Sequence, residues 1–367
     1  MIKKLLISTA VIVATTQMAA AADLSSMSWD DVVTQAKEEG ELTWYVWYLT
    51  DDLRRAAKTF EEEYGITVTI PEGTMEGNLE KLYADKARKT GDIDVFALGW
   101  DSYTSVDLSA MFMPLTALPK DDNRVSDLAG IDAGEYAFAF WGNQTGIAYD
   151  PTHITGDDLP QTPKEFAAFW QSHPEKFGFN YQNGGSGPSY YQNILRVVSG
   201  ADFSDPSDSK EHLAALQPGI DFFNAHAENY VITASNADSI TRISDGELWM
   251  APAWEDHLAG LQNRGEVRKD IKFYIPEMGM NGGGNGVSIP LNAPHSAAAA
   301  VFINWLISPE TQTVFNKEFG TAPMNAAADD SFALIPNAMR KYSTVSPNKP
   351  FRSAMEAKFT EEVVQQR

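Results

Sequence analysis

Among the places in this sequence where an aromatic side chain stands directly beside an acidic one, two are candidates for binding a small organic molecule. Trp100 is followed by Asp101, and Trp254 is followed by Glu255 and Asp256. An aromatic face stacks on a sugar ring or on a cation, and a carboxylate accepts hydrogen bonds from hydroxyls and amines. Because a charge is a poor neighbour for an apolar core, these pairs favour a binding surface over ordinary packing.

The segments before the first pair alternate between strand and helix patterns. Residues 42–48, 66–70 and 93–98 are rich in β-branched and aromatic side chains, as buried strands are. Between them, residues 51–64 and 79–86 show the helical spacing of apolar residues. This alternation predicts a parallel sheet with crossover helices, and ligands bind beyond the strand ends of such sheets.

Several candidate ligand-binding residues lie at the ends of the first and third of these strands. They are Trp47, Tyr48, Trp100, Asp101 and Tyr103. For Trp47 and Tyr48, ordinary core packing is an equally open alternative. It is less favoured for Trp100, because the charge of Asp101 stands beside it.

The rest of the chain indicates a second α/β unit. Prolines punctuate residues 151–206, and strand-like patterns return at 270–275 and 286–291. Helical patterns follow at 296–307 and 309–319. Without the leader described below, the chain keeps about 345 residues, which is more than one hydrophobic core usually serves, so we expect two domains.

The first residues have the form of a secretory signal peptide. Lys3 and Lys4 precede an apolar run from residue 5 to 13, and the small residues 19–22 offer a cleavage site. The run is shorter than the about 20 residues that span a bilayer. We therefore expect residues 1–22 to be removed and the mature protein to be periplasmic. Loss of the two lysines changes the net charge from −22 to −24 (−22 − 2).

The composition excludes several classes of partner. A strongly negative chain repels phosphate backbones, so we expect no nucleic-acid binding. The chain has no cysteine, which excludes disulfides and thiolate metal sites. Its six histidines are scattered singly, without the spacing of metal ligands. We expect neither a metal nor a cofactor.

Familiar catalytic motifs are missing from the sequence. It contains no Gly-x-x-x-x-Gly-Lys-Ser/Thr phosphate loop, no His-Glu-x-x-His and no Gly-x-Ser-x-Gly elbow; the nearest approach to the last, residues 184–188, ends in proline. Residues 282–286 lack the dinucleotide-binding spacing and precede a strand instead of following one. A secreted glycosidase that uses Asp101 and Glu255 stays an alternative, because that reaction needs two carboxylates flanking one bond. We expect a binding protein that is not an enzyme.

Five stretches of the chain, taken in order, resemble the spermidine/putrescine-type solute-binding proteins of bacterial ABC importers. The first is LTWYVWYLTDDLRRAAKTFEEEYGITVTI, followed by GDIDVFALGWDSY. The third, AFAFWGNQTGIAYDP, resembles the hinge crossing between the two lobes, and ISDGELWMAPAWEDHLAGL comes next. The last is the most specific, namely NGVSIPLNAPHSAAAAVFINWLISPETQTVFNKEFGTAPMN. The likeness covers most of the mature chain.

The resemblance implies an α/β fold, the two-lobed type II periplasmic binding protein, with hinge crossings and a ligand cleft between the lobes. Lobe 1 would comprise residues 23–142 and 283–320, and lobe 2 residues 143–282 and 321–367. The protein would act as a monomer that captures a small-molecule solute and delivers it to the transmembrane permease of an ABC transporter. A periplasmic sensor that presents its closed form to a chemoreceptor or kinase is an alternative with the same fold.

The resemblance also adds residues of the hinge stretch and of the second lobe to the expected binding site. The full set of expected ligand-binding residues is Trp47, Tyr48, Trp100, Asp101, Tyr103, Trp141, Asn143, Gln144, Trp254, Glu255, Asp256 and Asn285. Aromatic members would stack on the solute, while amides and carboxylates would hold its hydroxyls or amines.

Departures from the polyamine binders bear on the identity of the solute. Those proteins carry an aromatic residue and an aspartate before the strand that ends in Ile-Pro, where this chain has Gly-Gly-Asn-Gly at 283–286. Asn285 cannot neutralise an ammonium, so we expect a sugar or polyol, with a polyamine or another organic cation as the alternative. The ferric-ion branch places adjacent tyrosines where this chain has Trp254 and Glu255, which disfavours iron.

Overall fold

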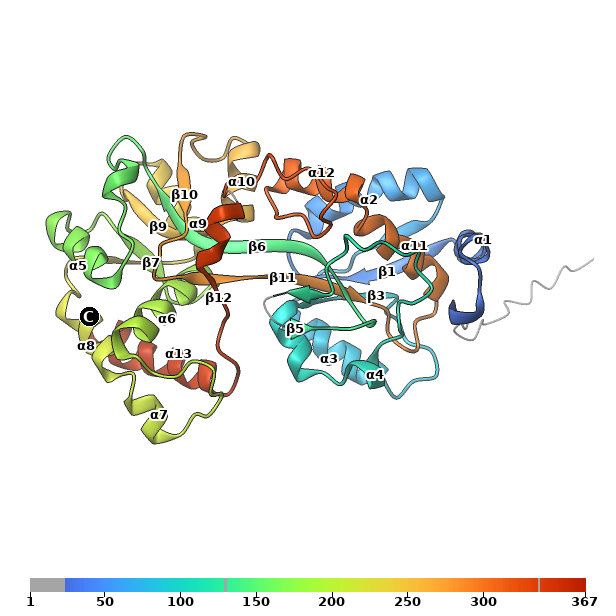
Figure 1. Ribbon diagram of the computed structural model, residues 1–367, viewed down its shortest axis with the longest axis horizontal. Coiled ribbons are helices and arrows are strands. Elements are labelled where there is room, and N and C mark those ends of the chain that lie inside the picture. Colours follow the sequence, from blue (N-terminus) through green and yellow to red (C-terminus); the bar gives the residue numbers. More distant parts are fainter. Residues whose placement is uncertain (1–23, 129–130, 336) are drawn as a thin grey trace, which may run out of the picture.

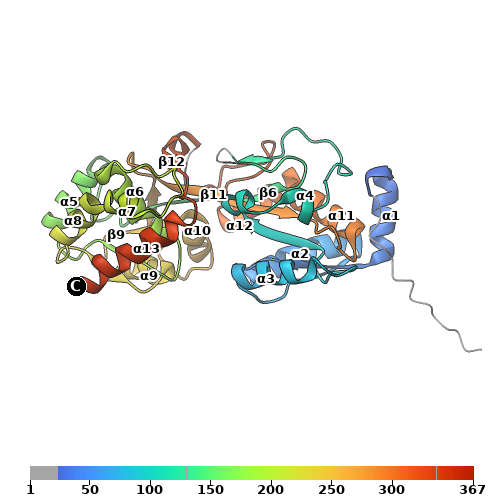
Figure 2. The same cartoon turned by 90° about the horizontal axis from the view of Figure 1, so that it is seen from below.

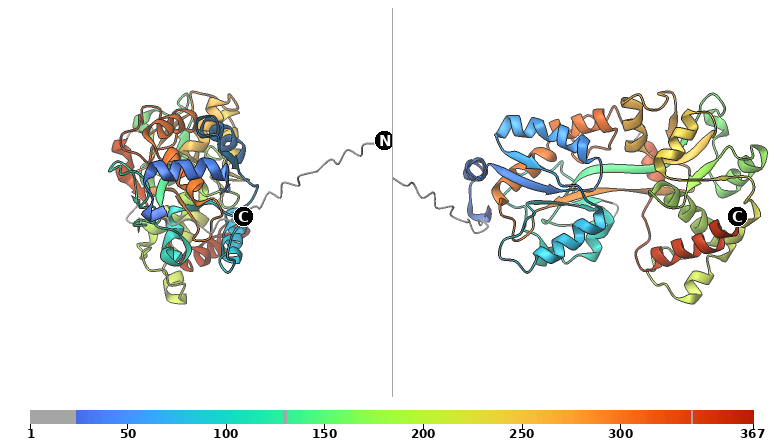
Figure 3. Two further views of the ribbon diagram at one scale, coloured as in Figure 1. Left: turned by 90° about the vertical axis from the view of Figure 1, so that its right-hand side faces the viewer. Right: turned by 180° about the vertical axis from the view of Figure 1, so that it is seen from behind.

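The computed structural model describes residues 24–128, 131–335 and 337–367, which form two lobes joined by two long strands (Figure 1). The signal peptide expected at residues 1–22 lies outside these ranges. Within them, no helix has both the length and the apolar character needed to span a membrane. Figures 2 and 3 show the lobes end to end along the long axis of the molecule, with the two strands running between them.

The first lobe is an α/β unit in which helices cover a sheet. Its helices and strands are α1 (Trp29–Glu39), β1 (Glu41–Tyr45), α2 (Thr50–Tyr64), β2 (Thr67–Thr69), α3 (Met75–Asp85), β3 (Val95–Gly99), α4 (Leu108–Met111), β4 (Asp127–Leu128), β5 (Ile131–Asp132), α11 (Ser296–Leu306) and α12 (Pro309–Phe319). β1 pairs in parallel with both β2 and β3. This is the arrangement that the strand and helix alternation predicts.

Local sequence signals set the boundaries of the first elements. The Ser28 side chain accepts a hydrogen bond from the backbone N–H of Asp31 and caps α1, whose first turn is acidic. Gly40 ends the helix with a φ of 72°, a conformation that glycine adopts without steric cost. β1 therefore begins at once, and its far end delivers the chain to Trp47 and Tyr48.

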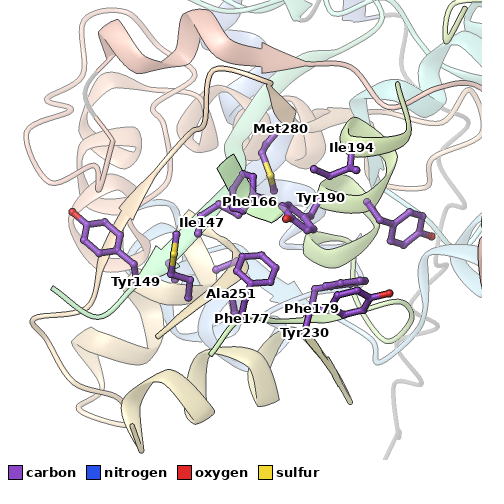
Figure 4. Packing of buried hydrophobic residues seen from close by; sticks show 14 of the residues in the cluster. Ile147, Tyr149, Phe166, Phe177, Phe179, Tyr190, Ile194, Tyr230, Ala251 and Met280 are labelled. Atoms are coloured by element: carbon purple, nitrogen blue, oxygen red, sulfur yellow. The ribbon is translucent and has the colours of Figure 1, made fainter. Parts of the chain in front are cut away.

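The second lobe packs helices around short strands and an aromatic core. Its helices and strands are α5 (Pro163–Ser172), β7 (Gly178–Asn180), α6 (Ser186–Ser199), α7 (Lys210–Ala214), α8 (Gln217–Ala225), β8 (Val231–Thr233), α9 (Asn236–Ser244), β9 (Met250–Trp254), α10 (Glu255–Asn263), β10 (Lys272–Tyr274), β12 (Ser343–Thr344) and α13 (Phe351–Glu362). Phe177, Phe179, Tyr190 and Tyr230 lie in the centre of this core (Figure 4). Tyr191 stacks on Phe359 of α13 with 3.9 Å between ring centroids, which attaches the C-terminal helix to α6.

Two crossing strands, β6 (Phe138–Tyr149) and β11 (Met280–Ser288), connect the lobes. They pair antiparallel with each other, while β11 also pairs with β3 in the first lobe and β6 with β9 and β10 in the second. A Cβ atom at Gly286 would lie 2.7 Å from the Trp100 ring, so glycine there lets that ring approach β11 closely. β6 runs without a break from residue 138 to residue 149, so the hinge crossing predicted at residues 137–151 is a single continuous strand.

The chain returns to the second lobe once more after α12. Ala322 and Asn325 form bridges with Gly142 and Arg124, so these residues still pack on the first lobe. Beyond them, the 3₁₀ helix η4 (Asn337–Tyr342) leads into β12, which pairs with β11. The lobe boundaries stay a prediction, but these bridges favour a last boundary beyond residue 325 in place of 320.

Candidate functional site

A cleft of about 610 Å³ lies between the lobes, beside the crossing strands. Both lobes and both crossing strands contribute to its walls. Eight of the twelve expected ligand-binding residues line it, namely Trp47, Tyr48, Trp100, Asp101, Asn143, Trp254, Asp256 and Asn285. The cleft is large enough for a small organic molecule.

Aromatic rings from both lobes form much of the cleft wall. Trp47 and Tyr48 follow β1 and contact each other edge to face, with ring centroids 5.1 Å apart. Trp100 begins the turn after β3, and its indole N–H donates to the carbonyl of Ile131 at 2.9 Å. Trp254, at the end of β9 in the second lobe, lies against Gly185 and lines the cleft as well. Aromatic residues of both lobes therefore contribute to the cleft wall, and Trp100 is only 1% exposed.

Asp256 is a buried carboxylate in the second-lobe wall. It occupies the first turn of α10 and is 8% exposed. The indole N–H of Trp141 donates to its Oδ2 at 2.9 Å, and the backbone N–H of His257 donates to its Oδ1 at 2.9 Å. Burial raises the pKa of Asp256, against the opposing effects of these donors and of the Asn143 side chain. Within the described residues, no lysine or arginine forms an ion pair with it.

His257 is the nearest group that could offset this charge, but burial lowers its pKa below the ordinary value of 6.5. A neutral His257 leaves the carboxylate of Asp256 with N–H donors and the N-terminal dipole of α10 to stabilise it. Such donors reduce the cost of burying a carboxylate without cancelling it.

Neutral polar groups surround Asp256. The Tyr48 hydroxyl is buried and makes no hydrogen bond to any residue that the structure describes. Burial raises its pKa well above the ordinary value, with the side chain of Asn285 opposing and the charge of Asp256 adding to the shift. A buried hydroxyl without a partner is costly, so Tyr48, Asn143 and Asn285 are suited to hydrogen-bond a ligand.

A second group of charges bridges the cleft at another point. Arg352 of α13 donates to Oδ2 of Asp101 at 3.0 Å, which connects the second lobe to the first. Glu356, one turn further along α13, accepts a hydrogen bond from the Gln192 side chain at 2.9 Å. Burial raises the pKa of Glu356, and the positive charges of Arg352 and Lys349 oppose that shift.

Known proteins share the sequence pattern of this chain. Residues 55–341 match the family of bacterial extracellular solute-binding proteins. The chain belongs to this family. No curated protein matches its sequence.

Solved structures with the same fold carry several kinds of cargo. Maltose-bound MalE3 from T. maritima superposes with a TM-score of 0.70 at 17% identity, over 89% of this chain and 95% of that one. PotD from Streptococcus pneumoniae, a spermidine/putrescine ABC transporter substrate-binding protein, gives 0.68 at 14% identity, over 89% and 98%. Iron-bound HitA from Pseudomonas aeruginosa gives 0.59 at 17% identity, over 89% and 98%. At these identities the likeness shows the two-lobed periplasmic binding fold.

The predicted fold, family and transport role are therefore confirmed. A solute-binding protein of ABC transport implies a small-molecule ligand and a permease as partners, and the family and these neighbours are substrate-binding transport proteins. Within the described residues, no group of three or more His, Cys, Asp and Glu side chains could hold a metal ion. The identity of the solute is a separate question, because neighbours of this fold carry sugars, polyamines or iron.

Four expected ligand-binding residues of this solute-binding protein do not line the cleft, because each is held by neighbours behind the wall. Tyr103 is 2% exposed and shares a hydrogen bond with Ser288. Gln144 donates to the carbonyls of Thr145 and Met280, and so ties the crossing strands together. These two residues lie behind the cleft wall and hold it through these hydrogen bonds.

Trp141 and Glu255 also lie behind the wall. Trp141 is fully buried against Tyr48, and its contact with the site is the hydrogen bond to Asp256. Glu255 is fully buried, and Arg340 donates to both of its oxygens at 3.0 and 2.9 Å. Burial raises the pKa of Glu255 to about 7, although Arg340 opposes the shift. Of the two adjacent acids, only Asp256 reaches the cleft.

Two helices, α6 and α13, also contribute side chains to the cleft that were not predicted from the sequence. Ser189 and Gln192 on α6, and Arg352 and Glu356 on α13, line the cleft. An Arg and a Glu four residues apart on a helix ordinarily indicate a solvated pair, so nothing in the sequence separates Arg352 and Glu356 from surface residues.

Proposed function

We propose that this protein captures a small organic cation in the cleft between its lobes and delivers it to the permease of an ABC importer, acting in the periplasm. The observation that carries the proposal is the carboxylate of Asp256. It lines the cleft, is nearly buried, and has no cationic partner among the described residues.

The energetic argument rests on the cost of burying a charge. An ion removed from water carries a penalty of several kcal/mol unless an opposite charge or hydrogen bonds compensate it. Trp141 and the backbone N–H of His257 supply hydrogen bonds to Asp256 but no positive charge, and burial raises its pKa in spite of them. A cation that binds beside Asp256 supplies the missing charge, whereas a neutral ligand supplies only hydrogen bonds.

The aromatic wall supports the same class of ligand. A cation within about 6 Å of an aromatic centroid gains up to roughly 2 kcal/mol when the pair is desolvated. Trp47, Trp100 and Trp254 reach the cleft from both lobes. Organic cations carry apolar groups as well as charge, so they match a cleft that combines rings with one carboxylate.

The proposed solute, an organic cation, differs from the sugar or polyol that we expected from the sequence. That expectation rested on Asn285, which stands where polyamine binders have an aspartate. Asn285 and Asp256 both influence the pKa of the Tyr48 hydroxyl, so both lie near it. The Asp256 carboxylate, which comes from α10, is therefore close to Asn285, where the polyamine binders have their aspartate. A sugar or polyol is the second candidate, because Asn143, Asn285 and the unpartnered Tyr48 hydroxyl can all bind ligand hydroxyls.

The first test is thermal unfolding of the purified mature protein with a panel of amines, quaternary ammonium compounds, sugars and polyols. A ligand at 100 times its Kd adds about 2.7 kcal/mol to the free energy of unfolding. We expect stabilisation by organic cations. Stabilisation by sugars or polyols alone would refute the cation and favour the second candidate.

Isothermal titration then compares two variants that lose one carboxylate each. Asp256→Asn should weaken binding of a cation at least roughly 30-fold, because removing one partner of a buried charge pair costs about 2 kcal/mol or more. Asp208→Asn, on an exposed loop of the second lobe, makes the same chemical change away from the cleft and should bind as the unaltered protein does. Equal affinities of the two variants would remove Asp256 from the site.

A further inference from the structure

Three carboxylates line the cleft among the residues that the structure describes, and they differ in how their charge is compensated. They are Asp101, Asp256 and Glu356. Asp101 pairs with Arg352 at 3.0 Å. Asp256 has only N–H donors.

Arg352 also acts on Glu356. The two residues lie one turn apart on α13, and the charges of Arg352 and Lys349 both act on the Glu356 carboxylate. The side-chain amide of Gln192 donates a hydrogen bond to one oxygen of that carboxylate at 2.9 Å. At this end of the cleft, Arg352 thus pairs with Asp101 and lies one turn from Glu356, so the two carboxylates share its positive charge.

The groups around Asp256 are of a different kind. Asn143 and the Tyr48 hydroxyl are neutral, as is Asn285, and all three line the cleft. They can bind a hydroxyl, an ether or a carbonyl, but they cannot neutralise an ammonium. A ligand anchored at Asp256 by its positive charge therefore meets neutral hydrogen-bonding groups elsewhere.

We infer that the cleft selects organic cations with a single positive charge and a hydroxylated or otherwise neutral polar remainder, and that Arg352 enforces this choice by occupying Asp101 and by placing its own positive charge beside Glu356. The inference rests on the proposed function, because it presupposes a cation at Asp256. A diamine would bring a second ammonium into a desolvated site that already holds the positive charge of Arg352, which costs more than a lost neutral hydrogen bond.

A pair of matched probes tests this directly. Putrescine and 4-aminobutan-1-ol have the same chain length and differ in that a hydroxyl replaces the second ammonium. Isothermal titration of the mature protein should show the amino alcohol binding at least about tenfold more tightly, which corresponds to 1.4 kcal/mol. The pair cadaverine and 5-aminopentan-1-ol repeats the comparison with a longer spacer.

Variants at Arg352 test its role in the selection. Arg352→Gln frees Asp101 and removes the positive charge beside Glu356, so the preference for the amino alcohol should fall at least about tenfold and putrescine should gain. Arg352→Lys keeps the positive charge and should keep the preference. Asp101→Asn removes a carboxylate without freeing one, so it should not favour putrescine. Thermal unfolding without ligand establishes that each variant is folded.

The outcomes separate this inference from the proposed function. If putrescine binds the unaltered protein as tightly as the amino alcohol and Asp256→Asn weakens both, the cation site stands and the single-charge selection is wrong. The single-charge selection is also wrong if Arg352→Gln is folded and still prefers the amino alcohol to putrescine as strongly as the unaltered protein does. If Arg352→Gln does not fold, the comparison on the unaltered protein still decides. If none of the four amines binds while a sugar or polyol does, both the proposed function and this inference fail.

Discussion

Replacing Trp141 by phenylalanine should change the acid–base behaviour of Asp256 without touching the cleft wall itself. The Trp141 indole N–H donates to Oδ2 of Asp256 at 2.9 Å, and both groups are buried. Phenylalanine keeps an aromatic ring against Tyr48, which contacts Trp141 edge to face with centroids 5.3 Å apart. The substitution therefore removes one hydrogen bond to a buried carboxylate and part of a ring.

The magnitude follows from the strength of that hydrogen bond. A hydrogen bond to a charged group contributes about 1.5–3 kcal/mol, and one pKa unit corresponds to about 1.36 kcal/mol. Its loss should raise the pKa of Asp256 by roughly one to two units above the already raised value. Because a cation binds the ionised carboxylate, affinity should fall about tenfold for each unit by which the pH lies below the pKa.

Two measurements check this. NMR titration of ¹³C-labelled protein, with the Asp256 signal identified by its loss in Asp256→Asn, reports the pKa without any ligand. Titration calorimetry from acid to neutral pH should show the affinity for a cation rising with pH to a plateau, with the midpoint shifted upward in Trp141→Phe.

The control is Trp44→Phe, which makes the same change in volume in the core of the same lobe. The Trp44 indole N–H is buried and has no hydrogen-bond partner in the described part of the chain. Trp44→Phe should leave the pH midpoint of the Asp256 titration unchanged. An unchanged Asp256 midpoint in Trp141→Phe, or an equal shift in Trp44→Phe, would refute the assignment of this hydrogen bond.

Three further predictions concern other parts of the molecule. Trp254→Ala should weaken ligand binding at least about tenfold in calorimetry with little change in thermal stability, because a cleft residue contributes contact more than core packing. Arg340→Gln should lower the free energy of unfolding by about 3 kcal/mol at pH 8, since it leaves Glu255 buried and unpaired; at pH 5 a protonated Glu255 should make the loss in a denaturant titration smaller. Asp94 raises the pKa of His295 above 6.5, so the stability from this pair is full below that pH and is lost as the pH rises through the folded-state pKa. His295→Gln should remove that part of the pH dependence of the melting temperature, and an unchanged profile would contradict it.

The strand ends of the first lobe could be predicted because short-range patterns determine them. The cap at Ser28, the left-handed turn at Gly40 and the apolar run behind Trp47 are each complete within about ten residues. A parallel sheet then brings the strand ends to one edge. Local signals thus placed Trp47 and Trp100 on the cleft before any tertiary contact was known.

The orientation of the two adjacent acids on α10 could not be predicted in the same way. Successive side chains on a helix point about 100° apart, so one of two neighbours faces the cleft and the other the interior. Which one does so depends on Trp141 and Arg340, which are 115 and 85 residues away in the chain. The sequence gives Glu255 and Asp256 as equal candidates, and only packing separates them.

The role of Arg352 could not be predicted from the sequence either, because its partner is still more distant along the chain. Its partner Asp101 is 251 residues away, and the pair forms because α13 returns across the second lobe to the cleft. A helix with a basic and an acidic residue four apart looks like any solvated helix face. The residue that we infer to select the charge of the ligand therefore carries no local signature.

The position of Asp256 connects ligand charge to the closing of the lobes. Asp256 belongs to the second lobe, whereas its partner Trp141 packs in the first against Phe315 and Phe319 of α12. Any movement that brings the walls together removes water from a carboxylate whose compensation is already incomplete, and that cost rises as the cleft closes. If the proposed cation binds at Asp256, it removes this cost and favours the closed form over the open one by the difference in its affinity for the two. On this proposal, selection of a cation and closure of the cleft are two consequences of the same buried charge.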